Sequence, residues 1–133
     1  KPYFTPSVSG DYVFGLEVSD GVNTSTEDNV NIGIRNNLAP VANDICPNDF
    51  VNLPAPFDAS SSYDKDGTIV SCSWNWGDGT PDYTETSTNA PDGTFDCKTT
   101  HTYSTTGLKN VTLTVKDDDN TTSTYSCQAV INP

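Results

Sequence analysis

The stretch VSCSWNWGDG, residues 70–79, alternates apolar and polar side chains and then ends in a Gly-Asp-Gly turn. Alternate side chains of a β-strand point to opposite faces, so Val70, Cys72, Trp74 and Trp76 share one face. We expect that face to be buried, because a strand with one apolar and one polar face packs its apolar face on a core. An exposed aromatic platform that stacks on sugars or collagen is the alternative interpretation.

The turn after this strand contains Gly77, Asp78 and Gly79. The two glycines permit positive φ, and the aspartate can accept hydrogen bonds from its own backbone. As a catalytic acid, Asp78 has no partner that the sequence identifies. WNWGDG is therefore interpreted as the end of a strand.

The same period of two residues recurs along the chain, in residues 12–18 and 111–115. Asp-Gly, Asn-Asn, Gly-Asp-Gly and Asp-Asp-Asp-Asn breakers separate the alternating segments. No segment sustains an apolar period of 3.6 residues between helix caps. The sequence predicts an all-β fold of short strands, spaced as in a β-sandwich.

The composition excludes several classes of partner. The 133 residues include six Lys and Arg against eighteen Asp and Glu, a net charge of −12. Such a chain repels nucleic acid and anionic lipid, so cations are its natural partners. No apolar run approaches the ~18 residues of a membrane span. The chain begins Lys1-Pro2 without a signal peptide and contains no Met, so we expect a processed or excised piece of a longer protein.

Cysteines and glycosylation motifs both indicate an extracellular protein. The four cysteines, at positions 46, 72, 97 and 127, form no close Cys-x-x-Cys pair, which favours two disulfides over zinc or free buried thiols. Asn-x-Ser/Thr motifs begin at Asn23, Asn110 and Asn120. We expect glycans at Asn23 and Asn120, which follow a strand in turn-like segments. Asn110 is close to a strand start.

An internal repeat divides the chain. At an offset of 97 residues and with no gap, residues 4–34 align with residues 101–131, and pairs such as Leu16 and Leu113 are identical. Residues 1–35 are therefore predicted to be the closing strands of a preceding domain, residues 36–38 a linker, and residues 39–133 a complete domain. Two strands alone cannot bury a face. We expect the missing strands from the chain upstream, or from a neighbouring molecule by strand addition.

Four motifs together resemble the PKD domain, an immunoglobulin-like module common in secreted bacterial and archaeal proteins. They are Ser62-Tyr63-Asp64-Lys65-Asp66-Gly67, Trp74-Asn75-Trp76-Gly77-Asp78-Gly79, His101-Thr102-Tyr103 and Gly107. Residues 39–133 carry the resemblance, and the N-terminal piece is similar to the closing strands of the same family. Two features depart from the family: Trp76 stands where Phe is usual, and residues 80–100 form a longer Thr-rich insertion.

The resemblance implies a core that contains Trp74, Trp76, His101 and Tyr103, with the histidine packed and hydrogen-bonded. The first and last strands of such a sandwich are neighbours. This topology favours a Cys46–Cys127 bridge, which leaves Cys72 to pair with Cys97 in the insertion. The four cysteines are not part of the family pattern, so the other two connectivities remain open.

Acidic residues are expected to gather at one end of the sandwich, where two loops meet the linker. They are Asp64, Asp66 and residues 117–119, of which Asp117 and Asp118 complete the predicted ligand set. A hard cation that takes six to eight oxygens would neutralise them, and the resemblance implies Ca²⁺, because some bacterial PKD domains bind it at this end. Bound Ca²⁺ would stiffen the joint with the preceding domain. A solvated acidic rim is the alternative.

The sequence indicates a protein that is not an enzyme. It contains no Gly-x-Ser-x-Gly motif, no Ser-His-Asp order and no phosphate loop. We expect a structural or adhesive module in a tandem extracellular array or fibre, with neighbouring domains of the same kind as partners. The alternative is an accessory domain that delivers a secreted hydrolase to polysaccharide or collagen. An exposed aromatic row, drawn from Tyr63, Tyr83 and Phe95, would distinguish that alternative.

Overall fold

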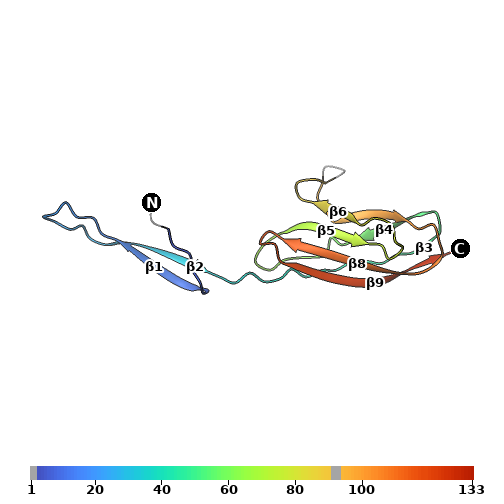
Figure 1. Cartoon of the computed structure of the whole chain (residues 1–133), viewed down its shortest axis with the longest axis horizontal. Helices are drawn as coiled ribbons and strands as arrows, with labels where there is room; N and C mark the ends of the chain where they lie inside the picture. The colour runs from blue at the N-terminus through green and yellow to red at the C-terminus, as the bar shows by residue number, and fades with distance from the viewer. Residues whose placement is uncertain (1–2, 91–93) are drawn as a thin grey trace. The chain divides into compact units, whose positions relative to one another are not determined.

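The computed structural model describes residues 3–90 and 94–133. Residues 1–2 of the predicted N-terminal piece and residues 91–93 of the predicted insertion lie outside the described residues. The described chain folds into strands, and no helix in it is long and apolar enough to cross a membrane. The all-β prediction is confirmed. The chain divides into two compact units, Lys1–Asn36 and Asn37–Pro133 (Figure 1).

Unit 1 is an antiparallel hairpin. Its strands are β1 (Gly10–Leu16) and β2 (Asp28–Ile34), and they form a two-stranded sheet. Gly10 lies opposite Ile34 and Leu16 opposite Asp28, with an unbroken register between them. Asp20 holds the hairpin tip by accepting hydrogen bonds from the next backbone N–H groups, an Asx-type turn.

Unit 2 is a sandwich of two sheets. The larger sheet has the strand order β3-β9-β8-β5-β6, and β4 and β7 form the smaller one. All pairs are antiparallel except β3 with β9, which is parallel. The long strands β8 and β9 run side by side (Figure 1). The strand bounds are β3 Asn48–Phe50, β4 Pro54–Asp58, β5 Ile69–Asn75, β6 Tyr83–Thr86, β7 Lys98–Thr102, β8 Gly107–Asp117 and β9 Thr122–Asn132.

The core of unit 2 lies between its two sheets. Strand β8 buries every second residue, as a strand with one wet face must. Trp74 and Leu113 of the larger sheet and Phe57 of the smaller one are among the large core side chains, each at most 1% exposed. Burial of one such side chain contributes about 1.5–3 kcal/mol, so these three together contribute roughly 5–9 kcal/mol.

The prediction of which β5 side chains point into the core is confirmed from Cys72 onward and is wrong at Val70. The pairing of β5 with β8 shifts its register between Ile69 and Ser71, which marks a β-bulge. Because a bulge inserts one residue, it reverses the alternation on one side. Ile69 therefore packs against the core in place of Val70.

Both predicted disulfides are present. Cys46 pairs with Cys127 and Cys72 with Cys97, with Cα–Cα distances of 6.1 and 5.6 Å. The first bridge ties the segment before β3 to β9, and the second joins β5 to the residue before β7 on the other sheet. All four cysteines are paired, so zinc binding by thiolates is excluded. Each bridge contributes about 2–5 kcal/mol in a small domain.

The three glycosylation motifs are on the surface. Asn23, Asn110 and Asn120 are all exposed. Asn110 lies on β8, where its side-chain oxygen accepts a hydrogen bond from Gln128. Asn120 has a φ of 69° in the turn between β8 and β9, a conformation that Asn tolerates better than most residues. Glycan occupancy remains a prediction.

Candidate functional site

The two tryptophans of the WNWGDG stretch are buried, at 0% and 2% exposure. Their rings lie nearly parallel, with centroids 6.3 Å apart. The indole Nε1 of Trp74 donates a 3.0 Å hydrogen bond to the Asp44 carboxylate. Burial raises the pKa of Asp44, although this hydrogen bond acts in the opposite direction. The core interpretation of this stretch therefore holds, and an exposed Trp platform is excluded.

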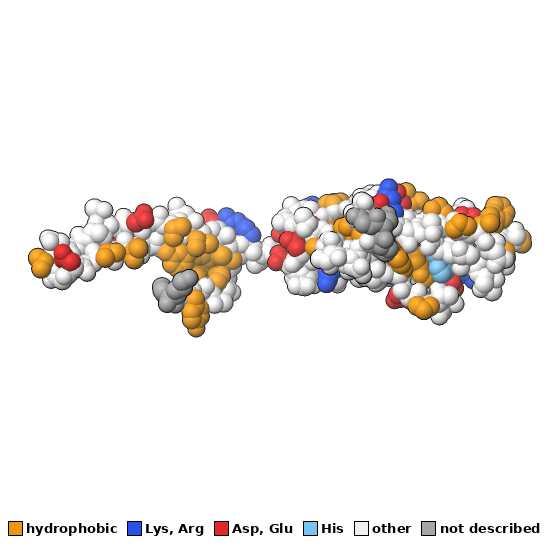
Figure 2. Space-filling view, turned by 90° about the horizontal axis from the view of Figure 1, so that it is seen from above, with side chains coloured by type: hydrophobic (Ala, Val, Ile, Leu, Met, Phe, Trp, Pro, Cys, Tyr) orange, Lys and Arg blue, Asp and Glu red, His pale blue; other side chains and the backbone are white. Residues whose placement is uncertain are grey.

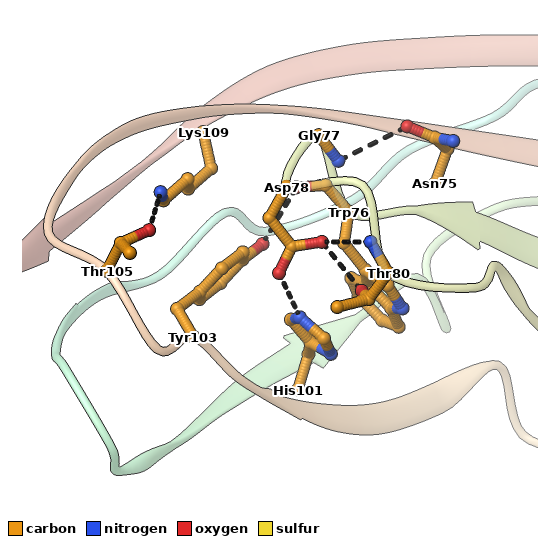
Figure 3. A network of polar contacts seen from close by, with 9 residues as sticks. All are labelled: Asn75, Trp76, Gly77, Asp78, Thr80, His101, Tyr103, Thr105 and Lys109. Carbon is orange, nitrogen blue, oxygen red and sulfur yellow. Dashed lines mark hydrogen bonds and ion pairs between the residues drawn. The ribbon is translucent and has the colours of Figure 1, made fainter.

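Asp78 and His101 form a close pair at the end of the same stretch (Figure 3). His101 Nε2 lies 2.8 Å from one Asp78 oxygen. The other oxygen accepts hydrogen bonds from the hydroxyl and the backbone N–H of Thr80 at 2.6 and 3.0 Å. The turn residue is thus tied both to its own backbone and to strand β7, which holds the end of β5 against the smaller sheet.

The Asp78 carboxylate is stabilised in its charged form. Burial raises its pKa, but the Thr80 hydroxyl and His101 outweigh burial and lower the pKa from 3.8 to about 2. Hydrogen bonds that favour the charged form have this effect in general. The carboxylate therefore stays ionised under all but strongly acidic conditions.

Aromatic rings surround the imidazole of His101. Its ring stacks on Trp76 with a centroid distance of 4.4 Å and meets the Tyr103 ring in a T-shaped arrangement, with centroids 4.5 Å apart. The Tyr103 hydroxyl donates to the Trp76 carbonyl at 3.3 Å. Burial, together with the charges of Asp78 and Asp44, raises the pKa of the Tyr103 phenol.

This arrangement is suited to holding the fold together. The side chains of His101 and Asp78 are only 14% and 10% exposed, whereas a general acid or base must reach its substrate. The sequence predicted a packed histidine but missed its partner, because 23 residues separate the two. It also missed the buried Glu85, whose carboxylate accepts a hydrogen bond from the Cys97 backbone N–H.

The predicted acidic end contains two carboxylates with structural roles. Asp117 is fully buried. One of its oxygens accepts from the Asn37 side chain at 2.8 Å and the other from the Thr121 backbone at 2.7 Å. Asp66 accepts from the Leu38 backbone N–H at 3.2 Å. These contacts fasten the predicted linker residues 37 and 38 to the sandwich, and both oxygens of Asp117 already have a hydrogen-bond donor.

The other two carboxylates converge on Gly67. A Cβ atom placed on this glycine would lie 2.4 Å from Asp118 Oδ1 and 2.8 Å from Asp64 Oδ2. Asp118 also accepts from the Thr68 backbone N–H at 2.8 Å, and this hydrogen bond lowers its pKa. Asp64 Oδ2 is buried and has no hydrogen-bond partner. A side chain at this position would require both carboxylates to move, and the two acids lie close together.

Asp64 and Asp118 supply some, but not all, of the oxygen ligands that a hard cation requires. A buried carboxylate oxygen without a donor is costly unless an ion or water satisfies it. Within residues 3–90 and 94–133, however, no group of three or more His, Cys, Asp or Glu side chains is arranged to hold a metal. The two acids would need backbone carbonyls and water to reach the six to eight oxygens that Ca²⁺ takes.

The predicted aromatic row does not form. Tyr63 is 47% exposed, but Tyr83 and Phe95 are partly buried and pack against the core. The Tyr83 ring contacts Trp74 at 6.0 Å. The other exposed aromatic side chains described in unit 2, Phe50 and Tyr125, lie on different strands. A flat platform for sugar rings is therefore missing from the described surface of unit 2.

Known proteins resemble both the sequence and the structure. The PKD domain family model matches residues 37–131. Collagenase ColA of Clostridium perfringens is 33% identical over 118 residues, which are 89% of this chain and 9% of that protein. The chain therefore spans less than a tenth of the length of this relative.

Solved structures share the fold. The PKD1 domain of Vibrio anguillarum Epp has a TM-score of 0.58 and 29% identity, over 73% of this chain and 98% of that one. The PKD1 domain of the Vibrio cholerae metalloprotease PrtV has a TM-score of 0.56 and 29% identity, over 72% and 100%. A structure of carbohydrate-binding modules from the β-sandwich superfamily has a TM-score of 0.59 and 27% identity, over 74% and 36%.

Proposed function

Because the chain belongs to the PKD domain family, with residues 37–131 matched, we propose that it is a non-catalytic structural module of an extracellular multidomain protein. The packed Asp78–His101 pair carries the proposal. It commits the only histidine of the chain to a partly buried contact that holds a turn to strand β7. The two disulfides support an oxidising compartment. The collagenase and metalloprotease relatives support a place beside a secreted hydrolase.

The exposed surface favours a spacer over a ligand-binding domain. Carbohydrate recognition by a flat sheet relies on aromatic rings that stack on the sugars. Of the predicted aromatic row, only Tyr63 is exposed. The alternative function, delivery of a hydrolase to polysaccharide or collagen, draws on the carbohydrate-binding and collagenase relatives. The two functions differ in whether this chain by itself adheres to an insoluble polymer.

Co-sedimentation tests this difference. We expect the full chain to stay in the supernatant when it is mixed with collagen fibrils, chitin or cellulose at 0.15 M salt. Tyr63→Ala should behave like the parent chain. If the parent chain pellets with one polymer and Tyr63→Ala does not, the spacer proposal is wrong and the accessory function takes its place. Phe50→Ala is a matched control, since it removes another exposed aromatic side chain from a different part of unit 2.

We further propose that Asp64 and Asp118 bind Ca²⁺ weakly, with Asp66 and backbone carbonyls nearby. The unpartnered Asp64 oxygen and the cradle around Gly67 support this. Extracellular sites of this kind have a Kd of about 1 mM. At 10 mM Ca²⁺ such a site stabilises unit 2 by about 1.4 kcal/mol.

The calcium proposal predicts a specific thermal shift. For a domain of this size, 10 mM CaCl₂ should raise the Tm by roughly 5–10 °C over EDTA. Fluorescence of Trp74 and Trp76 follows unit 2 alone, because unit 1 contains no Trp. The double variant Asp64→Asn, Asp118→Asn should lose the shift, and Asp119→Asn should keep it. An equal shift in all three proteins would show general screening of negative charge and would exclude the site.

A further inference from the structure

The hairpin of unit 1 exposes an apolar face. Phe4, Tyr12, Phe14, Val30, Ile32 and Ile34 line a concavity of about 280 Å³. Hydrophobic side chains gather over the hairpin in Figure 2. The ring of Phe4 lies against Tyr12 and Phe14, with centroids 5.2 and 5.0 Å apart. A face of this kind on a two-stranded sheet is not stable alone in water.

The hairpin repeats the geometry of β8 and β9. All seven residue pairs of β1 and β2, from Gly10 with Ile34 to Leu16 with Asp28, recur 97 residues later in the pairing of β8 with β9. A shift of one residue would send each side chain to the opposite face. The shared register therefore means that the same positions face inward in both hairpins.

Those inward positions are buried in unit 2 and open in unit 1. Leu113 and Val115 of β8 are 0% exposed, whereas the equivalent Leu16 and Val18 are 62% and 61% exposed. On the second strand, Ile32 is 42% exposed where its equivalent is the fully buried Ala129. Unit 1 thus has half of a sandwich core without the other half.

Unit 2 shows what covers this face. Strand β5 pairs with the edge of β8 that does not pair with β9. The β4–β7 layer supplies Phe57 and Ala55 to the core. In unit 1, β1 pairs only with β2 among the described residues. In the alignment at an offset of 97 residues, Phe4 corresponds to His101, which lies near the end of β7. Residues 3–5 therefore already stand where the opposing layer of a sandwich would end.

We propose that the apolar face of unit 1 is the docking site for the opposing β-layer of a second PKD sandwich, supplied by the same polypeptide ahead of Tyr3. The order of unit 2 supports this source, since β3 to β7 precede β8 and β9. A second copy of the hairpin is a poorer occupant. It offers no counterpart of β5 or β4, and two chains of net charge −12 repel each other. The inference is independent of the proposed spacer function.

Extension of the chain with its own strands tests the proposal. Residues 37–97 are placed before Lys1, a junction that the offset of 97 defines without a gap. The grafted copy of Cys46 is changed to Val, because its partner position in the hairpin is Val30. Hydrogen exchange of the β1 and β2 amides is then compared with that of β8 and β9 in the same molecule. We expect rapid exchange of β1 and β2 in the 133-residue chain and roughly 100-fold or greater protection in the extended one.

Two controls keep the test decisive. Phe14 and Ile32 are larger than Val111 and Ala129, so a second extended protein carries Phe14→Val and Ile32→Ala to match the grafted layer. If neither extended protein protects β1 and β2 while β8 and β9 stay protected, the proposal is wrong. Protection of β1 and β2 in the unextended chain, with a dimer in analytical ultracentrifugation, would identify a second copy as the occupant and would also overturn it.

Discussion

Replacement of Gly77 by alanine is expected to destabilise unit 2 by about 3–5 kcal/mol. Gly77 has a φ of 70°, a conformation that costs an L-residue about 1–2 kcal/mol. The larger cost is steric. A Cβ atom at this position would lie 2.2 Å from the backbone carbonyl oxygen of Asn110 on β8. Because that oxygen belongs to a central strand, the clash is relieved only by moving the turn or the strand.

Gly79 provides the matched control for this prediction. Its φ is 84°, but nothing lies within 4 Å of a Cβ atom placed there. Gly79→Ala should therefore cost only the conformational part, about 1–2 kcal/mol. Urea unfolding monitored by Trp fluorescence measures both variants in unit 2. If the two alanine variants are equally stable, the close approach of the turn to β8 does not decide the stability.

Replacement of Asp78 by asparagine is expected to destabilise unit 2 by about 2 kcal/mol at pH 6. Asparagine keeps the shape and can still accept from Thr80, but it loses the charge that faces His101. The folded-state pKa of Asp78 is about 2, below the ordinary value of 3.8. A lowered carboxyl pKa contributes stability that is present above about pH 4 and is lost as the pH falls through 2.

The pH dependence separates this charge effect from packing damage. The difference in unfolding free energy between the parent and Asp78→Asn should fall below about 1 kcal/mol at pH 2.5, because that pH lies well below the ordinary pKa of 3.8 and close to the folded-state pKa of about 2. Asp119→Asn changes an exposed acid and should leave the parent stability nearly unchanged at both pH values. A difference of 2 kcal/mol that persists at pH 2.5 would mean that the side-chain shape and not the charge is responsible.

The local signals in the sequence predicted the strands, the turn and the buried face of WNWGDG. Alternation of apolar residues is a local property that a strand preserves wherever it packs, so β1, β5 and β8 could be predicted from their own residues. The exception is Val70, which lies at a bulge. A bulge depends on how two strands pair, and the residues of one strand alone do not report it.

Relations inside the repeated unit could also be predicted from the sequence. Residues 4–34 and 101–131 align without a gap, and the hairpins that they form share one register. The pairing of Cys46 with Cys127 was predicted from the neighbourhood of the first and last strands of the resembling family. The repeat is found by aligning the chain with itself, whereas the disulfide prediction depends on topology, which the resemblance supplies.

Only the tertiary structure decided which partner each acidic side chain has and therefore which role it plays. Six carboxylates have different roles, because the distances that matter join residues remote along the chain. Asp78 meets His101 across 23 residues, Asp44 meets Trp74 across 30, and Asp117 meets Asn37 across 80. The remaining three are Asp64, Asp66 and Asp118. A carboxylate is stabilised by the donors that surround it in space, and those donors are brought together only when the sheets pack.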